Sequence, residues 1–435
     1  MQMIEKVSQK LRERYYKMHH ECGLDIYVFP KKLTSSYALF ATKYGSVDNE
    51  FRMAGDDAFI KVPNGIAHYL EHRMFTQKDG SDITERFSEY GADSNAYTTF
   101  TKTVYLFSCT DNFDSSLAAL LDFVTEPHFT DELVERERGI IVEEIKMGED
   151  NPYDRCFYGL LEAMYQNNSV RINIAGTEQS VSLITADMLN ACYRAFYNPS
   201  NMALVICGDV TPDQVMSIVS EHIPLPFVSC ETERKYKEEP KEVFTKVYEA
   251  YMPVSKPIFT IGVKDSFVGD TKERMARDAA MQILCEILFS RSGKLYNDLF
   301  ESGMISPDLS YGYSITEQFA FVNIGGEAED PPKVLDEIKA YIKNEQKNGI
   351  SPEAFERCKR VMLAEYVKGF DSTEEIANNM IDFIFDGGDI FDCYDIIEQV
   401  TFEDVKRLLD TAFDEEYYCL SVVYPEGWKK EDNNE

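Results

Sequence analysis

The chain has 435 residues, of which 44% are hydrophobic and 28% are charged. This length and composition predict two or three globular domains and exclude wholesale disorder. The net charge of −32 excludes nucleic acid as a partner, because phosphate binding requires a positively charged surface. The acidity predicts a solvated, soluble surface, and attraction of basic peptides stays open as an alternative.

The N-terminus and the cysteines indicate a cytoplasmic protein. The first residues, MQMIEKVSQKLRERYYKMHHECG, lack the positive and then apolar pattern of a signal peptide. No apolar run approaches the roughly 18 residues of a membrane span. The ten cysteines contain no Cys-x-x-Cys pair, and segments such as ALVICGD and MQILCEIL place them in apolar surroundings. We therefore expect reduced core cysteines in a cytoplasmic protein that does not enter a membrane.

The stretch GIAHYLEHRMF (65–75) contains the motif His-x-x-Glu-His. His68, Glu71 and His72 would project from one face of a helix that starts near Gly65. Neutral imidazoles at this spacing suit zinc, and a carboxylate beside them can take a proton from water on the metal. The apolar flanks favour a largely buried helix, and a polar surface helix stays open as the alternative.

A third ligand is expected in TDELVERERGIIVEEIKMGED (130–150), which begins with capping residues and an acidic first turn. On a helical wheel one side carries both apolar and acidic residues, namely Leu133, Glu137, Ile140, Ile141 and Glu144. A carboxylate within an apolar stripe is costly unless it meets a cation or a metal. The wheel therefore selects Glu144 over Glu143 as the third ligand. Glu137 becomes a candidate for orienting a ligand, and ordinary ion pairs stay open for both.

Two pairs of segments repeat along the chain at a nearly constant offset. Residues 185–206 and 402–423 each read as an amphipathic helix followed by a buried strand. Residues 35–47 and 256–268 each read as a strand. The repeats predict an α+β fold of two homologous domains, each a mainly antiparallel sheet covered by helices.

The two predicted domains are joined by a polar segment, the linker at residues 229–242. We expect a zinc-bearing catalytic domain at residues 1–228 and a second, metal-free domain of the same fold at residues 243–435. No histidine follows His222. The site, with one zinc ion per chain, is therefore expected in the first domain alone.

These motifs resemble the insulinase (pitrilysin) family of zinc peptidases, whose His-x-x-Glu-His motif is inverted. Here 71 residues lie between His72 and Glu144, which stands within ERGIIVEE. SNAYTTFTKTVYLFS (94–108) resembles the Asn-Ala-x-Thr strand of the family, and YNPSNMALVICGDV (197–210) resembles the stretch that closes its first domain. The two-domain size resembles the mitochondrial-processing-peptidase type and its bacterial relatives.

The resemblance implies a zinc-dependent endopeptidase that hydrolyses peptides or unfolded segments. His68, His72 and Glu144 would bind zinc, and Glu71 would be the general base that activates water. Glu137 is a further candidate of the catalytic site. Two other readings stay open, namely a non-catalytic scaffold that binds a partner, and a metal-binding protein without hydrolysis.

The stretch DSNAYTTFT alternates and ends in β-formers, which favours an edge strand. In the family the corresponding strand pairs with an extended substrate peptide. The resemblance therefore implies that Asn95 and Ala96 contact the substrate, and an ordinary strand without a substrate stays open.

The second half departs from the family's pattern. Relatives often carry an arginine and, seven residues later, a tyrosine that help to hold the substrate. Phe300 stands where the arginine is expected and Ser306 near the tyrosine position, although Tyr311 or Tyr313 could replace the tyrosine. We therefore expect a dimer, with a sister subunit or a second copy, that encloses a cleft or chamber and supplies the missing groups.

Overall fold

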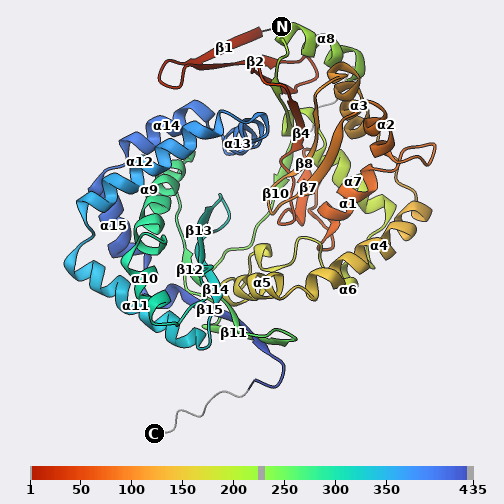
Figure 1. The fold of residues 1–435 in the computed structure, drawn as a ribbon. Helices are drawn as coiled ribbons and strands as arrows, with labels where there is room; N and C mark the ends of the chain where they lie inside the picture. Colours follow the sequence, from red (N-terminus) through yellow and green to blue (C-terminus); the bar gives the residue numbers. More distant parts are fainter. Residues whose placement is uncertain (1, 224–230, 429–435) are drawn as a thin grey trace. The chain divides into compact units, whose positions relative to one another are not determined.

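The computed structural model describes residues 2–223 and 231–428, and these form two compact units of mixed α and β structure (Figure 1). Unit 1 comprises Met1–Ile145, Asn173–Tyr236 and Tyr366–Phe391, and unit 2 comprises Lys146–Ile172, Lys237–Glu365 and Asp392–Glu435. The expected α+β architecture is confirmed. Among the described helices, none has the length and apolar character that crossing a membrane requires.

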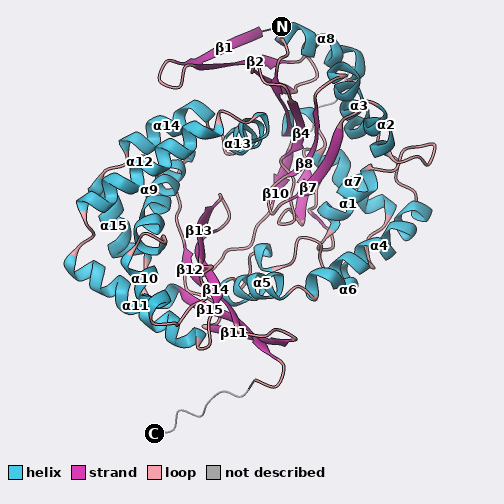
Figure 2. Ribbon diagram, viewed as in Figure 1, coloured by secondary structure: helices cyan, strands magenta, loops and turns pink. Residues whose placement is uncertain are grey.

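Unit 1 is built on a seven-stranded sheet (Figure 2). In spatial order its strands are β1 (Gln2–Ser8), β2 (Glu13–His19), β3 (Asp25–Pro30), β9 (Met202–Gly208), β4 (Ser36–Thr42), β8 (Thr103–Cys109) and β7 (Asp93–Thr98). Neighbouring strands are antiparallel except β3 and β9, which are parallel. A smaller sheet of β10 (Thr232–Arg234), β5 (Glu50–Met53) and β6 (Ile60–Lys61) completes the strands of the unit.

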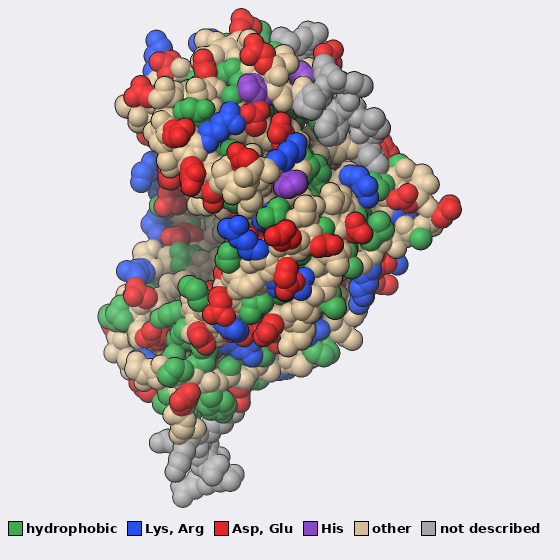
Figure 3. Space-filling model, turned by 90° about the vertical axis from the view of Figure 1, so that its right-hand side faces the viewer, with side chains coloured by type: hydrophobic (Ala, Val, Ile, Leu, Met, Phe, Trp, Pro, Cys, Tyr) green, Lys and Arg blue, Asp and Glu red, His purple; other side chains and the backbone are tan. Residues whose placement is uncertain are grey.

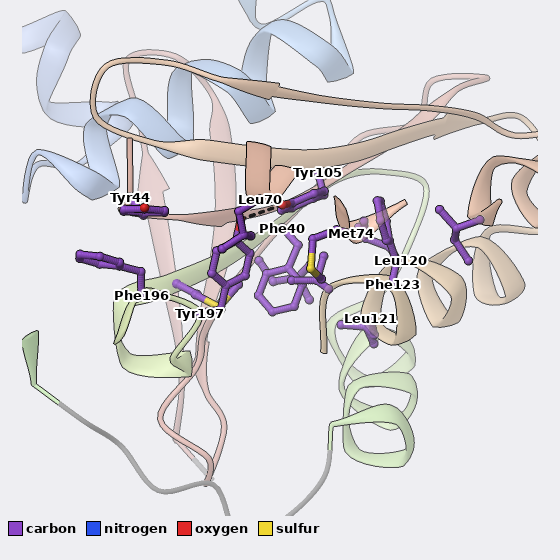
Figure 4. Packing of buried hydrophobic residues seen from close by; sticks show 14 of the residues in the cluster. Phe40, Tyr44, Leu70, Met74, Tyr105, Leu120, Leu121, Phe123, Phe196 and Tyr197 are labelled. Carbon is purple, nitrogen blue, oxygen red and sulfur yellow. Dashed lines mark hydrogen bonds between the residues drawn. The ribbon is translucent and has the colours of Figure 1, made fainter. Parts of the chain in front are cut away.

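Helices cover one face of this sheet over a large apolar core (Figure 4). They are α1 (Ile66–Met74), α2 (Ile83–Glu89), α3 (Phe113–Thr125), α4 (Asp131–Glu149), α6 (Glu178–Val181), α7 (Ala186–Phe196) and α8 (Pro212–His222), with the short 3₁₀ turn Pro199–Asn201. Alternation within the strands divides their side chains between the two faces. Leu204 and Ile206 of β9 enter this core, whereas Ala203 and Val205 enter the core on the opposite face.

The opposite face of the same sheet is covered by α13 (Thr373–Phe385), which comes from far along the chain. Ile376, Ala377, Met380 and Ile381 are buried against the strands. Their spacing forms an apolar stripe along one side of the helix. Burial of that stripe, rather than chain continuity, assigns α13 to unit 1.

Unit 2 is built on a five-stranded sheet of β11 (Val247–Met252), β15 (Tyr418–Pro425), β12 (Ile258–Asp265), β14 (Ala320–Glu327) and β13 (Ser310–Ile315), in that order. The first pair is parallel and the other pairs are antiparallel. Its helices, some of which begin or end at the border of the unit, are α5 (Pro152–Met164), α9 (Thr271–Phe289), α10 (Lys294–Glu301), α11 (Pro331–Asn348), α12 (Pro352–Gly369), α14 (Ile390–Gln399) and α15 (Phe402–Ala412), with the 3₁₀ turns Ser169–Arg171 and Glu415–Tyr417.

The two sheets share one topology. The order β3-β9-β4-β8-β7 in unit 1 and the order β11-β15-β12-β14-β13 in unit 2 have the same sequence of one parallel and three antiparallel pairs. The repeated segments of the sequence correspond to α7 with β9, α15 with β15, and the strands β4 and β12. The related fold of the two halves is therefore seen in the connections of the strands.

The compact units differ from two continuous domains at residues 1–228 and 243–435. α5 packs on β11, β12 and β15 within unit 2, and α13 packs on β4 and β9 within unit 1, so each half of the sequence contributes a helix to the other unit. The expected boundary near residue 228 lies outside the described residues. In the described part of the linker, β10 pairs with β5 in unit 1, whereas the residues from Lys237 on belong to unit 2.

The acidic composition is visible at the surface. On the face shown in Figure 3, carboxylate side chains are interspersed with lysine and arginine. Nine cysteines are described, all as free thiols, and all of them are buried except the half-buried Cys393. The core positions expected for the cysteines are thus confirmed for the described residues.

Candidate metal centre

The helix α1 carries the His-x-x-Glu-His motif and begins at a residue that must be glycine. Gly65 has a φ of 87° at the N-cap position, and a Cβ there would lie 2.4 Å from the carbonyl oxygen of Ala175. Only glycine combines this left-handed conformation with so close an approach. Ile66, Ala67, Tyr69, Leu70 and Met74 are buried. The expectation of a largely buried helix is confirmed, and the surface-helix alternative is wrong.

The helix α4 brings Glu144 to both histidines of α1. One carboxylate oxygen of Glu144 lies 3.5 Å from Nε2 of His68, and the other lies 3.3 Å from Nε2 of His72. One ligand atom from each of the three residues falls within 4.8 Å of the others. Hydrogen bonds from the two imidazoles, opposed by burial, hold the pKa of Glu144 well below its usual range.

The structure places Glu144 beside the two histidines but less deeply in the apolar side of α4 than the helical wheel predicts. The buried side of α4 consists of Val134, Ile141 and Ile145, whereas Ile140, expected inside the stripe, is 54% exposed. The side chain of Glu144 is 47% exposed. It lies at the border of the apolar side and faces the imidazoles, so the wheel identified the residue but placed it too deep.

Glu137 lies two helical turns before Glu144 and contacts the far side of His72. Its Oε1 is 3.2 Å from Nδ1 of His72, and its Oε2 is 3.5 Å from Nη1 of Arg73. Arg73 is fully buried. Burial lowers the pKa of His72, but the hydrogen bonds to Glu137 and Glu144 outweigh it and raise that pKa to about 10. In the metal-free protein, therefore, His72 is held as an imidazolium between two carboxylates.

Glu71 stands apart from the cluster of possible ligands. Its side chain is buried, and Oγ1 of Thr98 donates a hydrogen bond of 2.7 Å to its Oε2. Burial raises the pKa of Glu71, while His68, Thr98 and His72 oppose the rise. A raised pKa suits a group that must exchange a proton near neutral pH.

The strand β7, which holds Asn95 and Ala96, forms one edge of the seven-stranded sheet. Within the described strands it pairs with β8 alone, which confirms the edge-strand expectation.

The side chains of β7 contact both faces of the sheet. Ala96 packs against the core beneath α1, and Thr98 on the same face contacts Glu71. Tyr97 points to the other face and donates a hydrogen bond of 2.9 Å to Asn378 of α13. Asn95 accepts the backbone N–H of Ala96 at 2.9 Å, and substrate contacts of these two residues stay a prediction.

The second-half tyrosines considered as replacements have partners of their own in unit 2. The hydroxyl of Tyr311 donates to Glu286, and that of Tyr313 donates to Asp265 at 2.6 Å. Asp265 also accepts two hydrogen bonds from Arg277, at 2.7 and 2.9 Å. Phe300 is 44% exposed. Replacement of the expected tyrosine by Tyr311 or Tyr313 stays a prediction.

Two residues of the site were missed from the sequence. Thr98 could have been found, because it alternates with Ala96 on β7 and so shares the face that meets α1. Arg73 gave no signal of this kind, since its partner Glu137 lies on a separate helix 64 positions away.

The comparisons with known proteins agree with this geometry. The model of the insulinase family, peptidase family M16, matches residues 61–178, and that of the peptidase M16 inactive domain matches residues 183–362. The zinc protease YmfH of Bacillus subtilis is 38% identical over 430 residues, which cover 98% of this chain and 100% of YmfH. The chain belongs to the insulinase family, M16. The zinc protease YmxG of the same organism is 25% identical over 375 residues, covering 84% of this chain and 89% of YmxG.

Solved structures show that the M16 fold extends over nearly the whole chain. An M16-like peptidase from Alicyclobacillus acidocaldarius has 32% sequence identity and a TM-score of 0.91, covering 98% of this chain and 99% of its own. A protease from Helicobacter pylori, at 17% identity, has a TM-score of 0.79 and covers 95% of this chain and 100% of its own. A chain of complex III2 from Candida albicans, at 13% identity, has a TM-score of 0.74 and covers 94% of this chain and 95% of its own. The last two likenesses show the fold alone.

Proposed function

We propose that this M16 protein is a zinc-dependent endopeptidase that hydrolyses peptides or unfolded segments. The observation that carries the proposal is the meeting of His68, His72 and Glu144, with the buried carboxylate of Glu71 beside them and outside the cluster. Zinc storage alone would need no such base, and a scaffold would need none of the four. The names of relatives such as YmfH support a zinc protease.

The three residues fit a zinc ion in chemistry and in spacing. Two imidazole nitrogens and one carboxylate form a ligand set found in hydrolytic zinc sites, which leave one position open. Ligands about 2.0–2.2 Å from a tetrahedral ion lie about 3.3–3.6 Å from one another. The separations of 3.5 and 3.3 Å between Glu144 and the two histidines agree with that value. We assign one zinc ion per chain, held by these residues, with Glu137 fixing the ring of His72.

In the proposed mechanism, Glu71 accepts and donates the proton, and the strand β7 binds the peptide. A bound zinc ion would supply Lewis acidity, which acidifies water and polarises a carbonyl group. Glu71 takes the proton of the attacking water and returns it to the departing amine of the peptide. Its raised pKa brings the two protonation states closer in energy.

The substrate is proposed to bind as an added strand. The outer edge of β7 offers backbone hydrogen-bonding groups to an extended peptide, and the face that carries Ala96 and Thr98 is the face of Glu71. An extended peptide on this edge would run past the metal centre with alternate side chains on the two faces. We assign Asn95 and Ala96 to this contact.

We also propose that the chain works as a dimer with a family sister subunit or with a second copy. The missing arginine–tyrosine pair, and the separate partners of Tyr311 and Tyr313, support a contribution from another subunit. The fold also occurs in a chain of the multi-subunit complex III2 of Candida albicans. The free, mostly buried cysteines support a cytoplasmic location. Full turnover by the purified chain alone would contradict the role of a partner.

The test is the substitution Glu71→Gln, which keeps the shape of the side chain and removes the base. We expect zinc content equal to that of the wild type and peptide turnover lowered by about 10²- to 10⁴-fold, the usual range for general acid–base catalysis. Glu143→Gln is the matched control, because Glu143 is an exposed neighbour of Glu144. Undiminished hydrolysis by Glu71→Gln, measured with a quenched fluorescent peptide, would refute the assignment.

A further inference from the structure

The hydroxyl of Thr98 lies on the edge strand β7 and contacts the buried carboxylate of Glu71 on α1 at 2.7 Å. We propose that Thr98 is a positioning residue, which holds Oε2 of Glu71 and thereby turns Oε1 toward the attacking water. The inference rests on the proposed function, because it gives a role to the partner of the proposed base.

A count of the hydroxyl protons assigns the proton of Thr98 to Glu71. Oγ1 of Thr98 has a second neighbour, Oγ1 of Thr103, at 3.4 Å. Thr103 donates its own proton to the carbonyl oxygen of Tyr44 at 2.9 Å and can therefore only accept from Thr98. A carboxylate at 2.7 Å is a stronger acceptor than a hydroxyl at 3.4 Å. The proton of Thr98 consequently points to Glu71.

The burial of Glu71 makes this single contact important. The residue is 6% exposed, and Leu70 and Met74 of the same helix belong to the apolar core. Among the described residues, the bond from Thr98 is the one hydrogen bond to the carboxylate of Glu71. A buried carboxylate that loses its donor rotates in search of another partner or takes up a proton. Either change removes the base from the direction in which it must accept a proton.

A purely structural role of the Thr98–Glu71 contact is the competing explanation, and unit 2 contains a comparable contact. There, the hydroxyl of Tyr311 on the edge strand β13 donates to Glu286 on α9, the helix that corresponds to α1 by topology. The sequence ranges that form unit 2 contain no histidine. A contact between an edge strand and an inner helix can therefore serve packing alone, and the experiment must separate the two roles.

The experiment compares Thr98→Val, which removes the hydroxyl, with Thr98→Ser, which keeps it and removes the methyl group. Kinetics are measured on the zinc-loaded protein in the form in which the wild type turns over peptide, alone or with its partner subunit. We expect Thr98→Val to lower kcat about 10- to 100-fold, the effect of losing a hydrogen bond to a charged group. KM should change less than about twofold, and Thr98→Ser should restore most of kcat, because its hydroxyl can make the same bond.

Two measurements besides turnover define the role. Zinc affinity, from competition with a chelator, should be the same in Thr98→Val and the wild type, because Thr98 contacts none of the three proposed ligands. Peptide affinity, measured in the Glu71→Gln background where turnover is blocked, should also be unchanged by Thr98→Val. Thr99→Val is the matched control, because the Thr99 hydroxyl accepts N–H groups of Thr101 and Lys102 in the following turn and has no bond to Glu71.

The possible results distinguish failure of the proposed role of Thr98 from failure of the proposed peptidase function. An unchanged kcat in Thr98→Val, together with an inactive Glu71→Gln, would overturn the role of Thr98 and leave the peptidase proposal standing. Equal losses in Thr98→Val, Thr98→Ser and Thr99→Val would overturn it in favour of a structural role of the hairpin. Active Glu71→Gln, or a wild type without turnover in any form, would overturn the proposed function and the inference with it.

Discussion

α1 and α9 have the same position in two sheets of the same topology, and both bury apolar side chains, but they differ in the polar side chains that they carry. Along the chain, each helix comes between the middle strand of the shared five-strand order, β4 or β12, and the edge strand, β7 or β13. α1 presents two imidazoles and a buried carboxylate, whereas the end of α9 presents Leu284, Cys285, Leu288 and Phe289. The fold therefore tolerates either a polar cluster or an apolar core at this position.

Arginine pairs with aspartate near α9, whereas carboxylates gather around two imidazoles near α1. Arg277 and Asp265 form a bidentate pair, completed by the hydroxyl of Tyr313. In unit 1, the carboxylate oxygens of Glu144 lie 3.5 and 3.3 Å from the Nε2 atoms of His68 and His72. Ligand atoms that converge in this way form a group that could hold a metal ion. This difference supports the proposal that a metal ion binds in unit 1, at a position where unit 2 has no such group among its described residues.

The largest expected effect on the difference between the two units comes from substitution of His68. His68→Ala removes one of three proposed ligands, so we expect zinc affinity to fall by more than about 100-fold, beyond the loss seen when only a supporting residue of a metal site is changed. Hydrogen exchange should show zinc-dependent protection of α1 and α4 in the wild type and none in the variant. Protection of α9 and α12 in unit 2 should not respond to zinc in either protein.

His222→Ala is the control for this substitution. His222 lies in the same unit, with its Nδ1 2.7 Å from Asp122, and is not part of the proposed site. Its loss should leave zinc affinity unchanged. Equal zinc affinity of His68→Ala and the wild type, or protection of unit 2 by zinc, would remove the proposed difference between the two units.

A smaller expected effect is the dependence of zinc affinity on pH. The pKa of His72 is raised to about 10 in the metal-free protein, so zinc must displace a proton from this ring at neutral pH. Zinc affinity should accordingly rise about tenfold per pH unit from pH 7 to pH 9. The same shift means that His72 stabilises the metal-free fold fully below its unfolded pKa of about 6.5, and that this contribution is lost as the pH rises toward 10.

Glu137→Gln provides the matched comparison for the pH dependence. Glu137 supplies one of the two hydrogen bonds that raise the pKa of His72. Its substitution by the neutral amide should bring that pKa down and flatten the rise of zinc affinity above pH 7. An equally steep rise in Glu137→Gln and the wild type, in isothermal titrations with zinc, would show that His72 is not the group that loses the proton.

The sequence predicted the components of the site better than their surroundings. His68, Glu71 and His72 follow from the period of a single helix, and Glu144 from the stripe of another, because each depends on local geometry. The depth of Glu144 was wrong, since the wheel cannot show that Ile140 faces solvent. An apolar stripe on a helix also does not indicate which sheet the helix will cover. For this reason α13 was not recognised as a helix of unit 1. The contact between Thr98 and Glu71 was missed, although the alternation along β7 places Thr98 on the same face as Ala96.

The central claim is that one zinc ion binds at α1 and α4 and that none binds in unit 2. The most direct measurement is a crystal structure of the protein purified with zinc, with anomalous diffraction data collected on both sides of the zinc absorption edge. We predict a single anomalous peak per chain, about 2.0–2.2 Å from Nε2 of His68, Nε2 of His72 and a carboxylate oxygen of Glu144. A site without zinc, or a peak held by other residues, would contradict it.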